Sequence, residues 1–407
     1  MEKEKNSFMK KTMHVSTREF ITLIALLMSI VAISVDALLP ALGYIAKEIP
    51  FSHPNEGQFI ISALFLGMAL GQLICGPLSD ATGRRRVLFY GIFLFLVGST
   101  ICYFAQGIPS LLLGRFVQGL GVSAPYISAF SIVRDRFEGR EMAKIMSIVM
   151  MIFILVPALA PSLGQMILLL FSWRSIFLLY IFYSLLIGLW IFVRLEETLP
   201  REKRIPFQTK NILEGFREVV SNRITMTYTI CMGFFFGSFF GYLNSSQQIF
   251  QIQFETGKLF TVYFGGLALL FGIASLLNSR FVEKWGMHFI TKRATYGIIV
   301  SSFLFLILQW IVTIELWMFL PFVAVLFFCF GLLFGNFNSL AMEPMGHVAG
   351  IASAIIGSVS SILSMLIGTT IGQFYDQTVL PVTMGFLVMS CLSAILTRIF
   401  DPKFRSS

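Results

Sequence analysis

The chain has 407 residues, of which 56% are apolar and 13% charged, and its mean hydropathy is +0.82. Soluble domains average about 45–50% apolar and about 25% charged residues, so this composition excludes a single water-soluble domain and indicates a protein of the lipid bilayer. The net charge of +9 follows from the sidedness of the basic residues described below, so no nucleic-acid partner is expected.

Apolar runs long enough to cross a bilayer recur along the chain. A hydrocarbon core about 30 Å thick needs about 20 such residues per helix. Runs of this length predict an all-α integral membrane protein with twelve transmembrane helices, at 19–45, 57–79, 87–106, 109–133, 143–168, 173–194, 224–246, 259–279, 292–313, 316–340, 346–374 and 379–399.

The longest polar stretch, LEETLPREKRIPFQTKNILEGFRE, separates six spans from six. It predicts an amino-terminal six-helix bundle at 1–194, a linker at 195–218 and a carboxyl-terminal six-helix bundle at 219–407. The two halves repeat weakly, because the acid and glycine of Asp80-Ala-Thr-Gly83 recur as Glu283-Lys-Trp-Gly286 after the eighth span. Such internal symmetry is typical of transporters built from repeated bundles.

Basic residues gather on one side of the predicted membrane. With the N-terminus inside, all but four of the 30 lysines and arginines lie at cytoplasmic ends or in the linker; Lys47, Arg174 and Lys258 fall outside, and Arg115 falls within a span. This asymmetry predicts a multi-pass plasma-membrane protein with both termini and the linker in the cytoplasm.

The first span carries an acid at a depth where lipid is expected, Asp36 in ISVDALLPAL, and the fourth carries Arg115 in LLLGRFVQGLG, with Gln118 one turn on. Charges inside a span are costly unless they are paired. Burial and a neighbouring arginine act in opposite directions on the protonation of an aspartate, so such a pair can exchange a proton near neutral pH. Asp36 is therefore the predicted proton-coupling residue, with Arg115 and Gln118 as its modulators. A purely structural Asp36–Arg115 bridge is the alternative.

A further motif stands at the end of the second span. In GPLSDATGRRR, after the second span, Gly76 lies on a face of small residues, Asp80 can cap a helix or pair with an arginine, and Gly83 permits a tight turn before Arg84. An ordinary basic loop is the alternative.

The fifth span contains VPALAPSLGQ, with Pro157, Pro161 and Gly164. Prolines inside a helix free carbonyl groups and bend the axis. A kinked packing helix without further function is the alternative.

Polar residues near other span ends are candidates for a substrate cavity. We expect Tyr126 of the fourth span, Asn244 and Gln247 in GYLNSSQQIFQ, and Asn338 in GNFNSLAMEP to line it; polar groups at helix ends are the equal alternative. The 44 phenylalanines and 19 methionines suit an adaptable apolar cavity.

The five cysteines and four histidines are scattered, with no metal-ligand spacing and no catalytic constellation. We expect no cofactor, no metal and no enzymatic activity.

Taken together, these motifs resemble the major facilitator superfamily over the whole chain. The resemblance implies that Gly76, Asp80, Gly83 and Arg84 form a cytoplasmic gate, with Asp80 as the latch acid. It also implies a fourth-span motif for proton transfer at Arg115 and Gln118. The fifth span resembles the antiporter signature G-P-x-x-G-G, although Ala160 and Gln165 replace two of its glycines.

VDALLPAL, FSWRSIF and EETLP are similar to the bicyclomycin-resistance group of drug:proton antiporters. The expected function is therefore proton-coupled export of lipophilic or cationic drugs by alternating access, in a monomer whose partners are a small-molecule substrate, protons and the bilayer. Export of an endogenous metabolite or siderophore, import of a nutrient, and a receptor without transport are the alternatives.

Overall fold

The computed structural model describes residues 16–53, 55–137, 139–204 and 209–406, and within these ranges the chain is helical with no strand. The amino-terminal half comprises α2 (Thr17–Asp36), η1 (Leu39–Ala41), α3 (Leu42–Glu48), η2 (Glu56–Gln58), α4 (Phe59–Thr82), α5 (Arg84–Tyr103), α6 (Ile108–Arg136), α7 (Gly139–Leu170) and α8 (Ser175–Arg194).

The linker contains η3 (Arg201–Lys203) and α9 (Thr209–Ser221). The carboxyl-terminal half comprises α10 (Arg223–Gln247), the π-helical turn η4 (Gln248–Gln253), η5 (Gly257–Leu259), α11 (Phe260–Trp285), α12 (Met287–Ile311), α13 (Leu316–Met342), η6 (Glu343–Val348), α14 (Ala349–Gln373), α15 (Leu380–Phe400) and α16 (Pro402–Ser406).

The expected membrane spans are present as helices. Within the described ranges, 11 helical segments are long and apolar enough to cross a bilayer, and α7 adds the shorter apolar stretch Leu155–Leu170. Together they account for the twelve predicted spans, so the predicted all-α membrane fold is confirmed.

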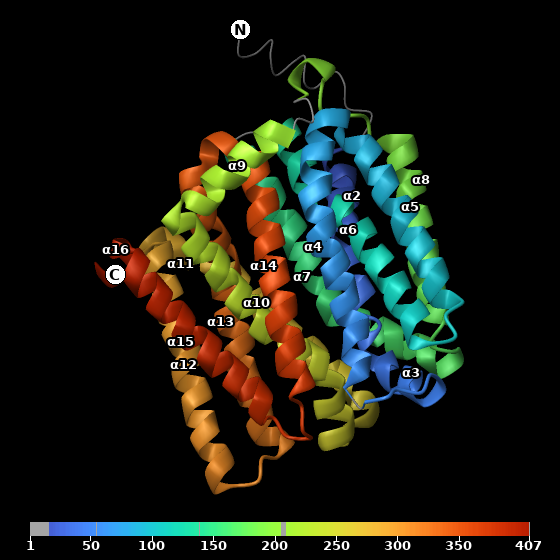
Figure 1. Ribbon diagram of the computed structural model, residues 1–407, viewed down its shortest axis with the longest axis vertical. Coiled ribbons are helices and arrows are strands. Elements are labelled where there is room, and N and C mark those ends of the chain that lie inside the picture. The colour runs from blue at the N-terminus through green and yellow to red at the C-terminus, as the bar shows by residue number, and fades with distance from the viewer. Residues whose placement is uncertain (1–15, 54, 138, 205–208, 407) are drawn as a thin grey trace.

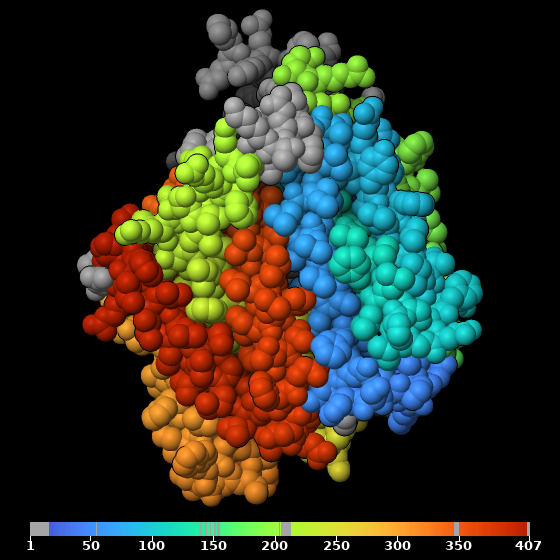
Figure 2. Space-filling model, in the orientation of Figure 1, coloured from blue at the N-terminus to red at the C-terminus, as the bar shows by residue number. Residues whose placement is uncertain are grey.

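The spans form two bundles of six helices. α2, α6 and α4 pack with α5, α7 and α8 in the first bundle, and α10 packs with α13, α14 and α15 in the second, which α11 and α12 complete. The bundles meet mainly where α4 lies beside α14 and α7 beside α11. Figure 1 shows α4 and α14 side by side along the middle of the molecule, and Figure 2 shows their surfaces in contact there. The boundaries at 194 and 219 stay a prediction.

The first span is broken, although the sequence predicts one continuous run at 19–45. α2 ends at Asp36, and η1 and α3 follow after a short turn. Pro40 has no N–H to donate to the carbonyl of Asp36, one turn earlier, which weakens the α-helical pattern at this point. Discontinuous spans of this kind are typical of transporter binding sites.

The two ends of the molecule differ. The end that carries the linker and the junction of α4 with α5 is called the linker end below; the opposite end, with α3, is called the far end (Figure 1).

Candidate transport site

Asp36 is buried at the break of the first span. Its side chain is 5% exposed, and no residue in the described part of the chain donates a hydrogen bond to its carboxyl group. Tyr180 of α8 lies close enough for electrostatic interaction and donates a hydrogen bond of 3.3 Å to the carbonyl of Ser34. The acid is therefore removed from water, as the sequence predicts.

Arg115 is also fully buried, but the expected Asp36–Arg115 ion pair is absent from the described residues. Its guanidinium group donates to the carbonyls of Ile60 at 3.0 Å and Ser34 at 2.9 Å. It also donates to Oε1 of Gln118 at 2.9 Å. The arginine thus ties α6 to α4 and α2 through neutral acceptors, and it contacts the backbone two residues from Asp36 rather than its carboxylate.

Gly164 brings α7 against this break. An added Cβ atom there would lie 1.9 Å from the carbonyl oxygen of Ala37, a distance that no side chain tolerates. Pro161 is buried beside it, and Pro157 lies one turn earlier in the same helix. The antiporter-like segment is therefore the part of α7 that packs against the residue next to Asp36.

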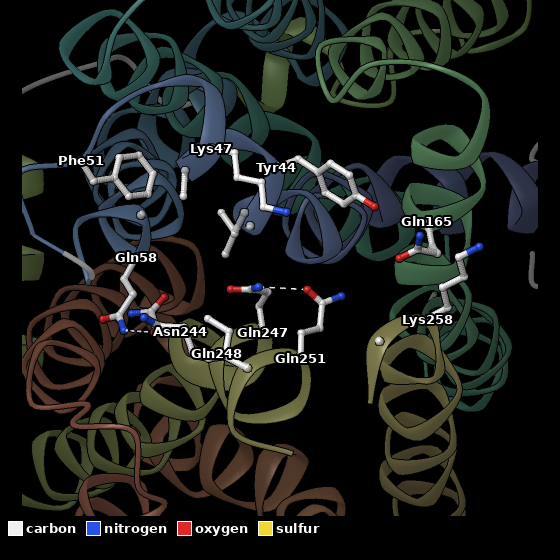
Figure 3. A pocket seen from close by; sticks show the side chains of 16 residues that line it. Tyr44, Lys47, Phe51, Gln58, Gln165, Asn244, Gln247, Gln248, Gln251 and Lys258 are labelled. Atoms are coloured by element: carbon white, nitrogen blue, oxygen red, sulfur yellow. Dashed lines mark hydrogen bonds between the residues drawn. The ribbon is translucent and has the colours of Figure 1, made fainter. Parts of the chain in front are cut away.

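A cavity of about 410 Å³ lies at the far end, between the two bundles (Figure 3). Its lining comes from α3, η2 and α7 on one side, and from α10, η4 and η5 on the other. The polar lining residues are Tyr44, Lys47, Gln58, Gln165, Asn244, Gln247, Gln248, Gln251 and Lys258.

Six of the lining residues carry a side-chain amide, and some of these amides lack partners. Gln165 is 7% exposed, and no described residue bonds to its amide. Asn244 is 1% exposed and donates to the carbonyl of Gly368 at 3.4 Å, but its Oδ1 atom has no partner. Gln247 donates to Oε1 of Gln251 at 2.9 Å. In Figure 3, Lys47 points toward this pair of amides.

The predicted cavity residues are only partly brought together. Asn244 and Gln247 line the cavity, whereas Tyr126 and Asn338 do not. Tyr126 packs on the ring of Phe130 in α6, and Asn338 is exposed on α13. The lining also combines six side-chain amides and two lysines with apolar residues, whereas the phenylalanine and methionine content suggests a mainly apolar cavity.

At the linker end, the GPLSDATGRRR segment contacts the other bundle. Oδ2 of Asp80 lies at the start of α14, 3.1 Å from the position of a Cβ on Gly350. A Cβ atom added to Gly76 would lie 3.1 Å from the methyl group of Ala354, which is also on α14. A carboxylate is stabilised at a helix N-terminus by the helix dipole, so Asp80 favours closure of this end.

Arg84 holds this acid in place. Its Nη1 atom lies 2.5 Å from Oδ1 of Asp80, and its Nε atom lies 2.9 Å from Oδ2 of Asp135 on α6. Gly83 has φ of +106°, a conformation that favours glycine. Glu197 of the EETLP segment accepts hydrogen bonds from the backbone N–H groups of Arg84 and Arg85, at 2.9 and 3.2 Å. The linker thereby caps α5 next to the gate motif.

At the far end, a network of amides joins the bundles. Asn55 donates to the carbonyls of Gln373 at 3.0 Å and Tyr375 at 2.9 Å, and it accepts from Gln248 at 3.0 Å. Gln58 donates to Gln248 at 2.8 Å. These residues partly close the far end beside the cavity.

Sequence reasoning missed most of this polar lining, although signals were present. Lys47 and Lys258 are two of the three basic residues that break the charge asymmetry, and both line the cavity. The third, Arg174, forms an ion pair with Glu48. Gln165 was visible only as a departure from the antiporter signature.

Known proteins similar to this chain agree with the geometry. Residues 24–369 match the family model of the Major Facilitator Superfamily. An uncharacterized MFS-type transporter, YdgK of Bacillus subtilis, is 32% identical over 372 residues, which cover 89% of this chain and 90% of the relative.

A bicyclomycin resistance protein homolog of Haemophilus influenzae is 28% identical over 92% of this chain and 94% of its own length. It confirms the resemblance to the bicyclomycin-resistance group. The xylose transporter XylE of E. coli, in a partially occluded inward open conformation, shares the fold with a TM-score of 0.75 at 13% identity, over 95% of this chain and 100% of that one. The chain belongs to the major facilitator superfamily of membrane transporters.

Proposed function

We propose that this protein is a proton-coupled exporter of drug-like organic compounds that works by alternating access. The observation that carries the proposal is the buried carboxyl group of Asp36, placed at the break of the first span. An ionisable side chain inside a membrane span marks a functional site by default. The name of the Haemophilus influenzae relative supports a role in drug resistance.

The coupling follows from one contact. Asp36 precedes Ala37, whose carbonyl touches Gly164, and the next residue of α7 is Gln165 in the cavity lining. A substrate that moves this part of α7 therefore also moves the backbone beside the acid. Protonation of Asp36 and occupation of the cavity can then alternate, with about one proton exchanged per cycle. Arg115 and Gln118 act as modulators, because Arg115 donates to the carbonyl of Ser34 in the same turn and Gln118 accepts a hydrogen bond from Arg115 and holds its guanidinium group.

The gate belongs to the linker end. Gly76, Asp80, Gly83 and Arg84 hold that end closed while the cavity is accessible from the far end, and release of Asp80 from the start of α14 accompanies opening toward the linker. We place both termini and the linker in the cytoplasm and the monomer in the plasma membrane of a bacterium. The lysines and amides of the cavity support a polar substrate better than the lipophilic or cationic drug expected from the sequence.

The proposal is tested in proteoliposomes with an imposed pH gradient. A panel of antibiotics and dyes is screened for gradient-driven movement, and the unaltered protein is compared with Asp36→Asn, which keeps the size of the side chain but cannot lose a proton. We expect gradient-driven transport to fall at least about tenfold in D36N, while exchange without a gradient is retained.

Asp376→Asn is the matched control, because Asp376 is an exposed aspartate in the loop between α14 and α15. This variant keeps an oxygen that can accept the hydrogen bond from Thr378. Gradient-driven transport by D36N at the rate of D376N would remove Asp36 from the mechanism.

A further inference from the structure

We infer that the far-end cavity binds polar organic anions, with the amides of Gln165 and Asn244 as hydrogen-bonding groups and Lys47 and Lys258 as the attracting charges. This inference rests on the proposed function, since it names the substrate class of the same cavity. It departs from the lipophilic or cationic drug expected from the sequence.

Two buried amides provide the first argument. Gln165 is more than nine-tenths buried and lines the cavity, and no partner for its amide occurs among the described residues. Oδ1 of Asn244 is likewise buried without a partner, and as an amide oxygen it can only accept a hydrogen bond, because Nδ2 of the same residue already donates to Gly368. Buried polar groups in proteins are nearly always hydrogen-bonded, so Gln165 is positioned to donate to a ligand and Asn244 to accept from an O–H or N–H group of the same ligand. They lie on opposite bundles, α7 and α10, and a ligand that contacts both would bridge the bundles.

The lysines provide the second argument. Lys47 on α3 and Lys258 on η5 approach the cavity from opposite bundles, and neither forms an ion pair with any described residue. Both stand on the side of the membrane where the sequence otherwise avoids basic residues. Arg174, the third exception, has a structural role in its pair with Glu48. The two lysines have no such ion pair among the described residues, and both line the cavity.

The absence of acids provides the third argument. None of the lining residues that the structure describes is an aspartate or a glutamate. Glu48, adjacent to Lys47 in sequence, accepts hydrogen bonds from Trp173 at 2.5 Å and from Arg174, so its charge is already neutralised. A cationic ligand would meet two like charges and no carboxylate among the described lining residues, whereas an anion would meet two attracting charges.

Gln165 also accounts for a sequence anomaly. It stands where the antiporter signature has its last glycine, directly after Gly164, whose close contact with Ala37 fixes the backbone. A glutamine in place of glycine adds a hydrogen-bonding side chain to the cavity. This side chain is one residue from Gly164, which touches the carbonyl of Ala37 beside Asp36. Gln165 is therefore assigned as a residue that determines specificity.

Direct binding tests the inference with two dyes that share a xanthene ring system, the anion 6-carboxyfluorescein and the cation rhodamine 123. Fluorescence polarisation is measured on the purified full-length protein in lipid nanodiscs at neutral pH, with no pH gradient. We expect carboxyfluorescein to bind at least about tenfold more tightly than rhodamine 123.

The variants locate the site. Lys47→Gln and Lys258→Gln should each weaken carboxyfluorescein binding by about fivefold, and Lys284→Gln, which removes a lysine at the opposite end of α11, should leave it unchanged. Gln165→Glu keeps the size and polarity of the side chain while adding a negative charge. It should shift the preference toward rhodamine 123, and because the readout is a preference, a merely destabilised protein would not produce it.

The inference is overturned if rhodamine 123 binds to the unaltered protein as tightly as carboxyfluorescein, if neither dye binds, or if the lysine variants and Q165E leave both affinities unchanged. Failure of the proposed function is distinguishable, because binding is measured without a gradient. An exporter that does not use Asp36 would still bind the anion, with the same affinity in D36N as in the unaltered protein.

Discussion

Gly164 lies where α7 touches the backbone of the first span, and the contact leaves no space for a side chain. Gly164→Ala should force the two helices apart beside Asp36. Overpacking of this kind costs about 1–3 kcal/mol, so the melting temperature of the purified protein should fall by several degrees and transport should fall with it.

Gly266→Ala is the matched control, because a Cβ atom at this position of α11 would meet nothing within 4 Å. The two variants are compared by thermal melting in detergent and by transport in vesicles. Equal melting temperatures for G164A and G266A would show that the α2–α7 contact tolerates a methyl group, and the proposed link between Asp36 and the cavity would lose its basis.

Residue types could be predicted from the sequence better than their partners. Asp36 and Arg115 stand out as charges inside apolar runs, and both are buried. The ion pair expected between them is not found among the described residues, because the guanidinium group bonds to the backbone carbonyls of Ser34 and Ile60 instead. The sequence does not show that these carbonyls are available as acceptors. The carbonyl acceptors depend on helix packing, which periodicity alone does not specify.

At the scale of elements, the amide network at the far end predicts a second gate. Asn55→Ala removes three hydrogen bonds between the bundles, to Gln373, Tyr375 and Gln248. Each contributes about 0.5–1.5 kcal/mol net, so we expect the open state of the far end to gain at least about tenfold in population.

Spin labels on cysteines introduced at Ser52 and Phe374, in a background without the native cysteines, measure the separation of the bundles at this end. Asn278→Ala is the control, since Asn278 bonds to Asn336 within one bundle. An unchanged distance distribution in N55A, identical to that of N278A, would exclude a gating role for the network.

Helix boundaries followed from the apolar runs, but the break of the first span did not. Pro40 lies inside the apolar run, and a proline in a span can either kink a helix or end it. Which outcome occurs depends on the packing of α7 against the turn. The amide network was equally hidden, because Asn55 and Gln373 are more than 300 residues apart in sequence.

At the scale of the whole molecule, the charge asymmetry predicts which side each end faces. Lys258 precedes α11 and Lys284 lies in its last turn, so the two residues mark the two ends of one span. In the cysteine-free background, Lys258→Cys should react with a membrane-impermeant maleimide on intact cells, and Lys284→Cys only after the membrane is permeabilised.

Labelling is read as a mass shift of the protein on a gel. The reverse pattern, with K284C labelled in intact cells, would place the linker outside and would invert the proposed direction of transport. Labelling of both variants in intact cells would indicate that the membrane barrier, rather than the topology, had failed.

The contacts along the seam between α4 and α14 determine how much free energy is needed to separate the two bundles at this place in the transport cycle. Small groups meet along it, with Ser62 bonded to Thr369 and Ser358 bonded to the carbonyl of Ala69, both at 2.8 Å. No ion pair within the described residues crosses it. One proton crossing a potential of 100 mV releases about 2.3 kcal/mol, which equals only two or three bonds of this strength. A seam built from such weak contacts can be opened and resealed by the ordinary resting potential of a cell, so turnover should slow when that potential is collapsed even if the pH difference is maintained.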